Sequence, residues 1–464
     1  MKVCPMSLTE AIITYHDLLT DTMAEDTQAQ LDDQLRARGL FFGDRPLCTV
    51  LRPRFLTPEQ YNFMRAGIHP LLTAFEKISH AAVADREFRA QFGLFDWEET
   101  LIHVDPGYRV HAPLSRLDSF FITEGDTLEL KFTEYNAEVP AASAYNDVLN
   151  EVFFGLPVMG QFLRHYAIRP VPTRHSVLHV LLSAYKEWST GRSAPAKPQI
   201  AILDWGEVPT RSEFELFLQY FSSQGLECRF VDPRHVEYRG GALYDGEGFR
   251  IDLIYKRVLI TELIEICGLD GPVVQAVRNG DVCMVNPFAC KLLYKKASLA
   301  VLSDERNAGL FSEREMGAIR DHIPWTRVVE ERTTTYHDMP VDLIPFIQKY
   351  REQFVLKPND DYGGRGIVLG WQTNASGWEA ALQTALETPH VVQERVRIPN
   401  EPYPSLVDGR LQIYNRMLDT APFVFYGEYT DGCLTRLSTD PLLNVSAGGG
   451  STVPTFIVEK RFAR

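Results

Sequence analysis

The chain has 464 residues, of which 45% are hydrophobic, so it can bury a large core and form about two to four domains. Its formal net charge is -14, and its sequence pI is near 5.4. This balance excludes the strongly basic surface with which proteins condense onto nucleic acid, and we expect no nucleic-acid partner.

The sequence shows no export or membrane signal. Residues 1–17 include Glu10, His16 and Asp17 and lack the continuous apolar stretch of a secretory signal. Apolar runs such as Val177 to Leu182 are shorter than the ~20 residues that cross a bilayer. The seven cysteines are scattered and form no Cys-x-x-Cys pair, which is typical of reduced thiols. A soluble, cytoplasmic protein without a membrane partner is predicted, and its oligomeric state is left open.

The N-terminal part, from Ser7 to about Trp97, is predicted to be helical. Within it, Thr57-Pro58-Glu59 combines a capping threonine with a proline at the first helical position, which marks a helix start. After Glu98 the composition changes to short β-like runs separated by turn tripeptides. The predicted strands are Thr100 to Val104, Ser119 to Thr123 and Thr127 to Phe132.

A segment rich in Pro, Ala, Ser and Gly, Gly191 to Pro198, is predicted to link two domains. A strand, a helix and a second strand follow it, and this order favours a parallel, Rossmann-like sheet. No Gly-x-Gly-x-x-Gly motif follows the first strand, so no dinucleotide is assigned to it. From Asn286 onward, helices and strands alternate again. Four regions are therefore predicted, with the boundaries 1–97, 98–190, 191–285 and 286–464.

A lysine and a glycine-rich turn stand between two apolar runs. The first run, Phe354 to Leu356, leads into Lys357-Pro358, and the second begins at Ile367. Two strands joined in this way can fold over a triphosphate, because glycine backbone N–H groups approach its oxygens and the lysine adds a compact positive charge. The alternative is a surface hairpin that needs its glycines only for the turn. The glycines are Gly363, Gly364 and Gly366.

Some 30 positions after this turn, the apolar residues Val391-Val392 run into the polar residues Gln393 and Glu394. In a nucleotide site, such a segment can present backbone groups to an adenine edge and a carboxylate to a ribose. The alternative is an ordinary strand end.

Oxygen-bearing side chains gather far ahead of the turn, in Arg116-Leu117-Asp118 and in Glu134-Tyr135-Asn136. In a strand, Glu134 and Asn136 point to one face, and Phe132 is expected to share it. Magnesium prefers hard oxygen ligands and keeps several waters, so such carboxylate and amide groups can hold it against ATP phosphates. The alternative is a solvated acidic face, which fits poorly with the apolar flanks of this segment.

Together these motifs resemble those of the ATP-grasp ligases. The segment Val391 to Val396 resembles the hinge of that family. In most members the Glu-x-Asn pair follows the hinge, whereas here it precedes Lys357 by about 220 residues. The order is similar to that of the circularly permuted branch typified by the synthetase domain of glutathionylspermidine synthetase. The resemblance implies a mixed α+β and α/β fold. Its parts are an N-terminal helical region, a circularly permuted ATP-grasp domain and a Rossmann-like pre-ATP-grasp domain.

The resemblance also implies roles for individual residues, with ATP and Mg²⁺ as cofactors. The implied metal ligands are Asp118, Glu134 and Asn136. Phosphate is expected to bind Lys357 and a second lysine, for which Lys296 matches best and Lys295 is the alternative. Arg116 is expected to steady the transferring phosphoryl group. The triphosphate cover and the nucleoside contacts are expected from Gly363, Gly364, Gly366, Gln393, Glu394 and Val396.

The implied activity is that of an ATP-dependent carboxylate-amine ligase, which joins a small-molecule or peptide carboxylate to an amine through an acyl phosphate. The start of the glycine turn, Asn359 to Tyr362, is longer and more acidic than in glutathionylspermidine synthetase, and no N-terminal amidase with a Cys/His pair is recognisable. The substrates of that enzyme are therefore not predicted, and its bifunctional form is excluded. Two alternatives remain: a nucleotide-binding scaffold and an ATP-dependent phosphotransferase.

Two further segments are candidates for substrate contacts. Tyr255-Lys256-Arg257, at the end of a predicted strand, can receive a substrate carboxylate or can be a solvated strand end. Asn444 to Ser451 contains three consecutive glycines and is either a loop over the site or a passive linker.

Overall fold

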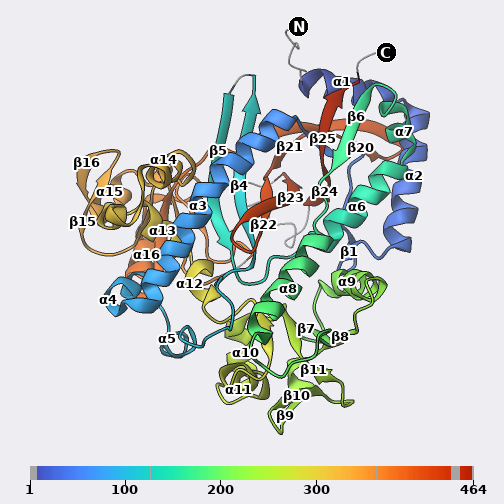
Figure 1. Ribbon diagram of the computed structural model, residues 1–464. Coiled ribbons are helices and arrows are strands. Elements are labelled where there is room, and N and C mark those ends of the chain that lie inside the picture. Colours follow the sequence, from blue (N-terminus) through green and yellow to red (C-terminus); the bar gives the residue numbers. More distant parts are fainter. Residues whose placement is uncertain (1–7, 126, 362, 440–449, 462–464) are drawn as a thin grey trace.

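The structure is a computed structural model that describes residues 8–125, 127–361, 363–439 and 450–461 (Figure 1). It is a mixed α/β arrangement whose larger sheets have seven, four and four strands. The N-terminal region is helical, as predicted. Its helices are α1 (Leu8–Leu18), α2 (Asp21–Ala37), α3 (Pro58–Ala84), α4 (Arg86–Arg89) and α5 (Asp96–Leu101).

Helix α3 begins where the sequence predicts a helix start. The hydroxyl of Thr57 accepts the N–H of Gln60 at 3.2 Å, and the side-chain oxygen of Gln60 accepts the N–H of Thr57 at 2.9 Å. Pro58 occupies the first helical position. The reciprocal bonds satisfy amide groups that a helix start otherwise leaves unpaired, so the cap fixes the position of this long helix.

The predicted strand at Thr100 to Val104 is wrong. Helix α5 extends to Leu101, and turns follow it. The carboxylate of Glu98 accepts the N–H of Phe95 at 2.8 Å, which is the bond of a helix start. This local cap, together with the burial of Glu98, outweighs the β propensity of the following threonine, isoleucine and valine.

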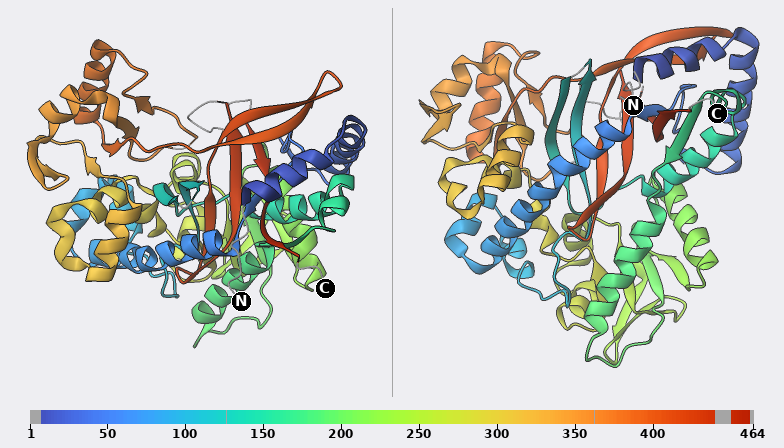
Figure 2. Two further views of the ribbon diagram at one scale, coloured as in Figure 1. Left: turned by 90° about the horizontal axis from the view of Figure 1, so that it is seen from above. Right: turned by 45° about the horizontal axis from the view of Figure 1, so that its top comes forward.

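The largest sheet combines strands from both halves of the chain. Its strands are β4 (Leu114–Glu124), β5 (Thr127–Asn136), β20 (Asn400–Val407), β21 (Arg410–Leu418), β22 (Ala421–Phe425), β23 (Tyr429–Ser438) and β24 (Ser451–Val453). Their order is β20-β21-β23-β22-β4-β5, and β24 pairs with β23. In Figures 1 and 2 the teal hairpin β4–β5 stands beside the red strands β22 and β23. Both strands predicted in the hairpin are present and longer than expected.

Helix α3 covers one face of this sheet (Figure 1). The ring of Phe75 lies 4.3 Å from that of Tyr135 on β5, and Ile78 and Phe121 belong to the same fully buried cluster. Burying each such side chain contributes about 2 kcal/mol. Because side chains alternate along a strand, residues next to Tyr135 point to the opposite face of β5, away from α3.

The predicted parallel sheet follows the predicted linker. Its order is β13-β12-β7-β8, and all three pairings are parallel. The strands are β7 (Ile200–Leu203), β8 (Cys228–Val231), β12 (Leu253–Lys256) and β13 (Cys283–Val285). The nearby helices are α8 (Arg174–Ser189), α9 (Arg211–Ser223), α10 (Ile260–Cys267) and α11 (Pro272–Arg278). A small antiparallel sheet is formed by β9 (Val236–Arg239), β10 (Ala242–Asp245) and β11 (Arg250–Ile251).

The glycine turn belongs to a second four-stranded sheet, with the order β14-β19-β17-β18. Its strands are β14 (Thr326–Val328), β17 (Phe354–Pro358), β18 (Val368–Leu369) and β19 (His390–Glu394). Beside it is a hairpin of β15 (Thr333–Tyr336) and β16 (Met339–Asp342). The helices of this part are α12 (Cys290–Tyr294), α13 (Ala297–Ser303), α14 (Glu313–His322), α15 (Leu343–Lys349) and α16 (Ala375–Glu387).

The remaining elements join the ends of the chain. Strand β25 (Thr455–Lys460) lies between β3 (Arg54–Leu56) and β6 (Tyr166–Pro170). The others are α6 (Ser143–Gly155), α7 (Pro157–Phe162), β1 (Phe41–Phe42), β2 (Arg45–Pro46) and the 3₁₀ turns Ala90–Phe92, Pro233–His235, Glu305–Leu310 and Arg351–Gln353. Within the described ranges, the helices are all too short or too polar to cross a membrane.

Candidate functional site

Four polar side chains that the sequence singles out share one face of the β4–β5 hairpin. Arg116 is paired with Asn136 across the two strands, and Asp118 is paired with Glu134. Cross-strand partners in an antiparallel sheet lie on the same face, as do residues two apart in one strand. Since Tyr135 points toward α3, these four side chains point away from it and can contact a ligand.

Phe132 does not share this face, contrary to the prediction. The register shifts after Asp118 so that β5 contains one extra residue, Thr133. Such a bulge reverses the alternation of side chains on its two sides. Phe132 is consequently buried in the core cluster that contains Tyr135.

Two arginines hold the carboxylate of Asp118. Arg116 donates to both of its oxygens, at 2.7 and 3.1 Å, and Arg436 of β23 donates to Oδ2 at 2.7 Å. Burial raises the pKa of Asp118, but the two guanidinium groups outweigh this effect and hold the pKa at about 2. Arg436 also donates to Asp419 at 2.6 Å, so it bridges two buried carboxylates.

Lys357 lies in β17 and faces the β4–β5 hairpin. Its ammonium group donates to Oε1 of Gln393 at 2.7 Å and to the backbone carbonyl of Thr133 at 3.1 Å. Burial lowers the pKa of Lys357 to about 8, an effect that Glu134 opposes and Lys296 strengthens. The contact with Thr133 places the lysine of the glycine turn beside the acidic face of β5.

The two adjacent lysines Lys295 and Lys296 point to different partners. Lys296 Nζ lies 3.3 Å from Oε1 of Glu134 and donates to the backbone carbonyl of Asp361 at 2.6 Å. Lys295 instead pairs with Glu98, at 2.9 Å, in a fully buried cluster. Lys296 is thus the one of the pair that contacts both the acidic face and the glycine turn.

The glycine turn connects β17 to β18, which pair antiparallel as predicted. Gly363, Gly364 and Gly366 have φ values of 66°, 75° and 67°, a left-handed conformation that glycine adopts without steric cost. A Cβ atom at Gly366 would lie only 2.6 Å from Cγ of Pro358. Asn359, at the start of the turn, accepts the N–H of Ala297 at 2.9 Å, which fixes the turn to helix α13 next to Lys296.

The hinge segment lies at the end of β19. The amide nitrogen of Gln393 donates to the hydroxyl of Thr326 at 3.1 Å, so this buried side chain is held on one side by Thr326 and on the other by Lys357. Glu394 is half-buried and bonds to the β15–β16 hairpin. Val396 lies two residues beyond the strand and is also half-buried.

The segment Tyr255-Lys256-Arg257 is buried, so its interpretation as solvated strand-end charge is wrong. Arg257 donates to Glu213 at 3.1 Å, and Lys256 Nζ lies 3.7 Å from Glu138. These two charges therefore have carboxylate partners within the protein. The other candidate for substrate contacts, Asn444 to Ser451, lies mostly outside the described residues.

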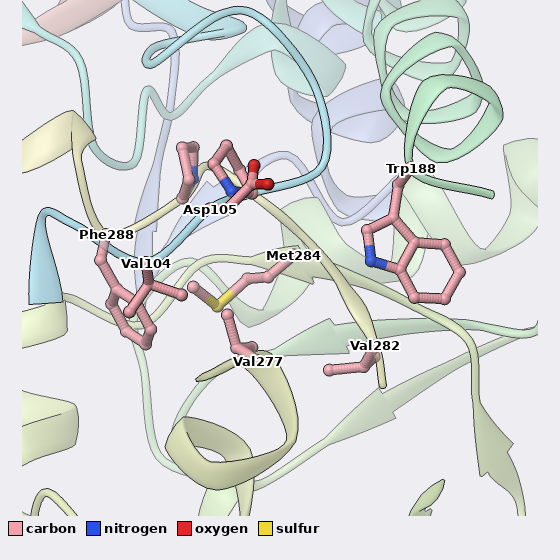
Figure 3. Close-up of a pocket in the computed structure, with 9 residues that line it drawn as sticks. Val104, Asp105, Trp188, Val277, Val282, Met284 and Phe288 are labelled. Atoms are coloured by element: carbon pink, nitrogen blue, oxygen red, sulfur yellow. The ribbon is translucent and has the colours of Figure 1, made fainter. Parts of the chain in front are cut away.

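The predicted site residues do not line either of two cavities in the described part of the structure. One, of about 10 Å³, is bounded by Val104, Trp188, Val277 and Met284 (Figure 3), and it has room for about one water molecule. The other, of about 690 Å³, surrounds the linker and includes Lys197, Gln199 and Asp252. The predicted site is instead formed by side chains of β4, β5, β17 and β19 and the residue before α13.

The described residues contain no group of three or more His, Cys, Asp or Glu side chains arranged to hold a metal ion. The predicted metal set differs from such a group because it has two carboxylates and one amide. Magnesium fits this donor set, since it commonly takes one or two protein carboxylates and completes its shell with water and substrate phosphates. Glu134 and Asn136 are only partly buried, so both residues keep some exposure to solvent.

The solved structure of a glutathione synthetase-like effector from Globodera pallida aligns over 94% of this chain and 97% of its own, with a TM-score of 0.61 and 12% sequence identity. This chain therefore shares an ATP-grasp-like fold with that structure. A provisionally named γ-glutamylcysteine synthetase from Methylobacillus flagellatus aligns over 80% of this chain and 82% of its own, with a TM-score of 0.39 and 11% identity.

Sequence comparison finds a further relative. A protein of Frankia alni carries the provisional name glutamate–cysteine ligase 2-3. It is 24% identical over an alignment 474 residues long, which covers 94% of this chain and 51% of that protein. The chain thus spans about half the length of the curated relative that it matches. No protein-family model matches it.

Within this ATP-grasp-like fold, the structure adds two residues that the sequence reasoning missed. Arg436 and Asp419 lie 318 and about 300 positions after Asp118, with which Arg436 forms an ion pair. Neither stands in a recognisable motif. The sequence offers one indication of Arg436: it is the one charged residue between Leu434 and Ser438, in an otherwise uncharged segment of β23.

Proposed function

We propose that the chain is an ATP-dependent carboxylate-amine ligase that forms an amide or peptide bond through an acyl phosphate. The observation that carries this proposal is the contact of Lys357 with Thr133, which brings the lysine of the glycine turn to the strand of Glu134 and Asn136. Phosphoryl transfer needs positive charge and a metal site at the same phosphates. An ordinary surface hairpin and a separate acidic face would have no reason to meet.

We also propose that the ATP-grasp domain is circularly permuted. Strands β4 and β5 precede β17 in the chain, with residues 137–353 between β5 and β17, yet β4 pairs with β22, which follows β17. This arrangement supports a single site built from regions 98–190 and 286–464. Region 191–285, which contains the parallel sheet, is proposed as the pre-ATP-grasp part, and region 1–97 as a helical cover.

The proposed nucleotide site follows from the contacts of the two lysines. Lys357 and Lys296 approach Glu134 from different elements and would neutralise negative charge on the β- and γ-phosphates. The backbone of Gly363, Gly364 and Gly366 would cover the triphosphate, because glycines in this turn conformation let the backbone approach phosphate oxygens closely. The nucleoside would lie along the hinge at Gln393, Glu394 and Val396.

Mg²⁺ would be held mainly by Glu134 and Asn136. Asp118 lies on the same face, but both of its oxygens already accept bonds from arginines. Each carboxylate oxygen has two lone pairs, so Asp118 can complete the site as a third ligand. When bound, the metal would neutralise phosphate charge and align the γ-phosphate.

In the proposed reaction, a carboxylate oxygen of the acid attacks the γ-phosphorus, and the bond between that phosphorus and ADP breaks. The amine nitrogen then attacks the carbonyl carbon of the acyl phosphate, the carbon–oxygen bond to phosphate breaks, and the nitrogen loses a proton. Arg116, held by the carbonyl of Ala141 at 2.9 Å and by Asp118, is placed to steady the transferring group. The protein acts mainly by positioning and by charge stabilisation.

The name of the Frankia relative suggests L-glutamate and L-cysteine as the first substrate pair to test. The experiment is a phosphate-release assay with ATP, Mg²⁺ and paired acids and amines, extended to other amino acids, short peptides and polyamines. A ligase requires both partners and yields a product whose mass equals their sum minus one water. Formation of ADP and a phosphorylated acid with the acid alone, without an amine, would indicate a phosphotransferase instead.

Two variants connect this assay to the site. Lys357→Met and Glu134→Gln are expected to abolish turnover, because each removes a charge that contacts the phosphates or the metal. Far-UV circular dichroism serves to show that both variants remain folded. Full turnover in both folded variants would refute the proposal.

A further inference from the structure

The carboxylate of Glu394, in the hinge, is held by a hairpin that the proposed chemistry does not use. The hydroxyl of Tyr336 donates to Oε1 of Glu394 at 2.7 Å. Nε2 of His337 lies 3.0 Å from the same oxygen, and because a carboxylate only accepts, the imidazole is the donor. Both residues belong to the tip of the β15–β16 hairpin.

This hairpin is attached directly to the hinge. The backbone carbonyl of Trp325 accepts the N–H of Glu394 at 2.8 Å, and the indole N–H of the same residue donates to the carbonyl of Thr335 at 2.7 Å. Arg327 donates to the hydroxyl of Thr334 at 2.8 Å and to the carbonyl of Thr335 at 3.2 Å. Trp325 thus links the hinge to the hairpin, and Arg327 forms a second attachment to the hairpin.

The two side chains that hold Glu394 are themselves constrained. The ring of Tyr336 packs against Trp325 at 5.2 Å, Phe346 at 4.8 Å and Phe354 at 5.9 Å. His337 has a φ of 44°, a left-handed conformation that is uncommon for residues other than glycine, although asparagine, aspartate and histidine adopt it more often than the rest. This backbone places the imidazole beside Tyr336, with the ring centroids 4.3 Å apart.

Both bonds converge on Oε1, so Oε2 is the oxygen through which Glu394 can accept a bond from a ligand. Two donors on one oxygen also stop the carboxylate from rotating freely. A ribose hydroxyl is a donor of the kind that such an oxygen accepts. A sugar that lacks this hydroxyl would leave the aimed oxygen without its partner.

We infer that Tyr336 and His337 are positioning residues that aim Glu394 at a ribose hydroxyl, so that this chain selects ribonucleotides over deoxyribonucleotides. The inference rests on the proposed function, because it takes ATP as the ligand of the hinge. It assigns a role in nucleotide selection to the β15–β16 hairpin, which carries no other polar contact to the proposed site among the described residues.

The test is calorimetric measurement of dissociation constants for ATP, 2′-deoxyATP and 3′-deoxyATP with Mg²⁺, which needs no acid or amine substrate. The wild-type chain is expected to bind ATP about tenfold more tightly than one of the two analogues, since a hydrogen bond to a charged group is lost. Tyr336→Phe removes only the hydroxyl. It is expected to weaken ATP binding about fivefold and to leave binding of that analogue unchanged.

His337→Asn shortens the side chain and introduces a residue type that tolerates positive φ. This variant is also expected to reduce the preference for ATP over the deoxy analogue. Tyr350→Phe is the matched control, because Tyr350 packs on Phe346 in the same aromatic cluster but does not contact Glu394. The control should keep the selectivity of the wild type.

The outcomes separate the two levels of the proposal. If the wild-type chain binds no ATP, the proposed function fails, and the hinge role fails with it. If it binds ATP without distinguishing the deoxy analogues, or if Tyr336→Phe weakens all three nucleotides equally, the positioning role is refuted and the ligase proposal stands.

Discussion

Lys291 Nζ lies 2.6 Å from Oδ1 of Asp360, a contact that connects helix α12 to the start of the glycine turn. Lys295 approaches the other oxygen of Asp360 at 3.2 Å, and it also pairs with Glu98. The carboxylate of Glu138 joins the cluster, 3.5 Å from Lys291. Asp360, in the acidic start of the turn, is thus ion-paired inside the protein.

We predict that Asp360→Asn destabilises the protein by about 3 kcal/mol at pH 7, because two buried lysines lose their shared carboxylate. Urea unfolding measures this loss. Burial raises the pKa of Asp360, but Lys291 and Lys295 outweigh burial and lower it below its usual value. A lowered carboxylate pKa gives stability above pH ~4 that disappears as the pH falls further, so the difference between wild type and variant should shrink in acid.

Asp338→Asn is the control for this change, because Asp338 is exposed in the β15–β16 turn. It should alter the free energy of unfolding by less than about 0.5 kcal/mol. An Asp360→Asn variant as stable as this control would show that the buried cluster does not depend on Asp360.

Lys357 gives a prediction about pH. Its pKa is lowered to about 8, chiefly by burial, so the charge that would attract phosphate is present below pH 8 and is lost above it. We expect the dissociation constant for ATP to rise about fivefold between pH 8 and pH 9 as the protonated fraction falls. Calorimetric titrations at constant ionic strength measure this change. Lys357→Met should bind ATP weakly with little dependence on pH, and an equally steep profile in that variant would assign the titration to another group.

Arg436 is predicted to matter because it lies between Asp118 and Asp419. Arg436→Met should destabilise the protein by about 3 to 5 kcal/mol in urea unfolding, since removing one partner leaves buried charge uncompensated. Burial raises the pKa of Asp419 even with Arg436 present, so a neutral group is tolerated there. Adding Asp419→Asn to the variant should therefore restore part of the loss. No recovery in the double variant would contradict this electrostatic account.

The sequence alone is sufficient to predict the relative positions of site residues that lie within one strand or hairpin. Lys357, the glycine turn and the pair of Glu134 and Asn136 each depend on spacing within one strand or hairpin, so their positions follow from the period of the backbone. The β5 bulge is different. It depends on pairing with β4, and one extra residue there moved Phe132 to the core face.

Contacts between distant segments could not be derived in this way. Arg436 reaches Asp118 only because β23 and β4 flank the same strand, β22. Similarly, Lys295 and Lys296 are neighbours in the short connection between the end of α12 and the start of α13. The geometry of this connection decides which of the two lysines faces Glu134. Such choices are set by tertiary packing, which no local pattern records.

The last prediction concerns the metal. Glu134→Gln keeps the size of the side chain but removes a negative charge from the proposed Mg²⁺ site, where a carboxylate is a far better ligand than an amide. Wild-type ATP binding should tighten when Mg²⁺ is added, and in the variant this gain should fall by about tenfold. Glu129→Gln makes the same change earlier on β5, outside the site, and should retain the full gain. Titration of Mg²⁺ at fixed ATP compares the three proteins. If Glu134→Gln responds to Mg²⁺ as strongly as the control, the face formed by Asp118, Glu134 and Asn136 is not the metal site, even though Lys296 pairs with it.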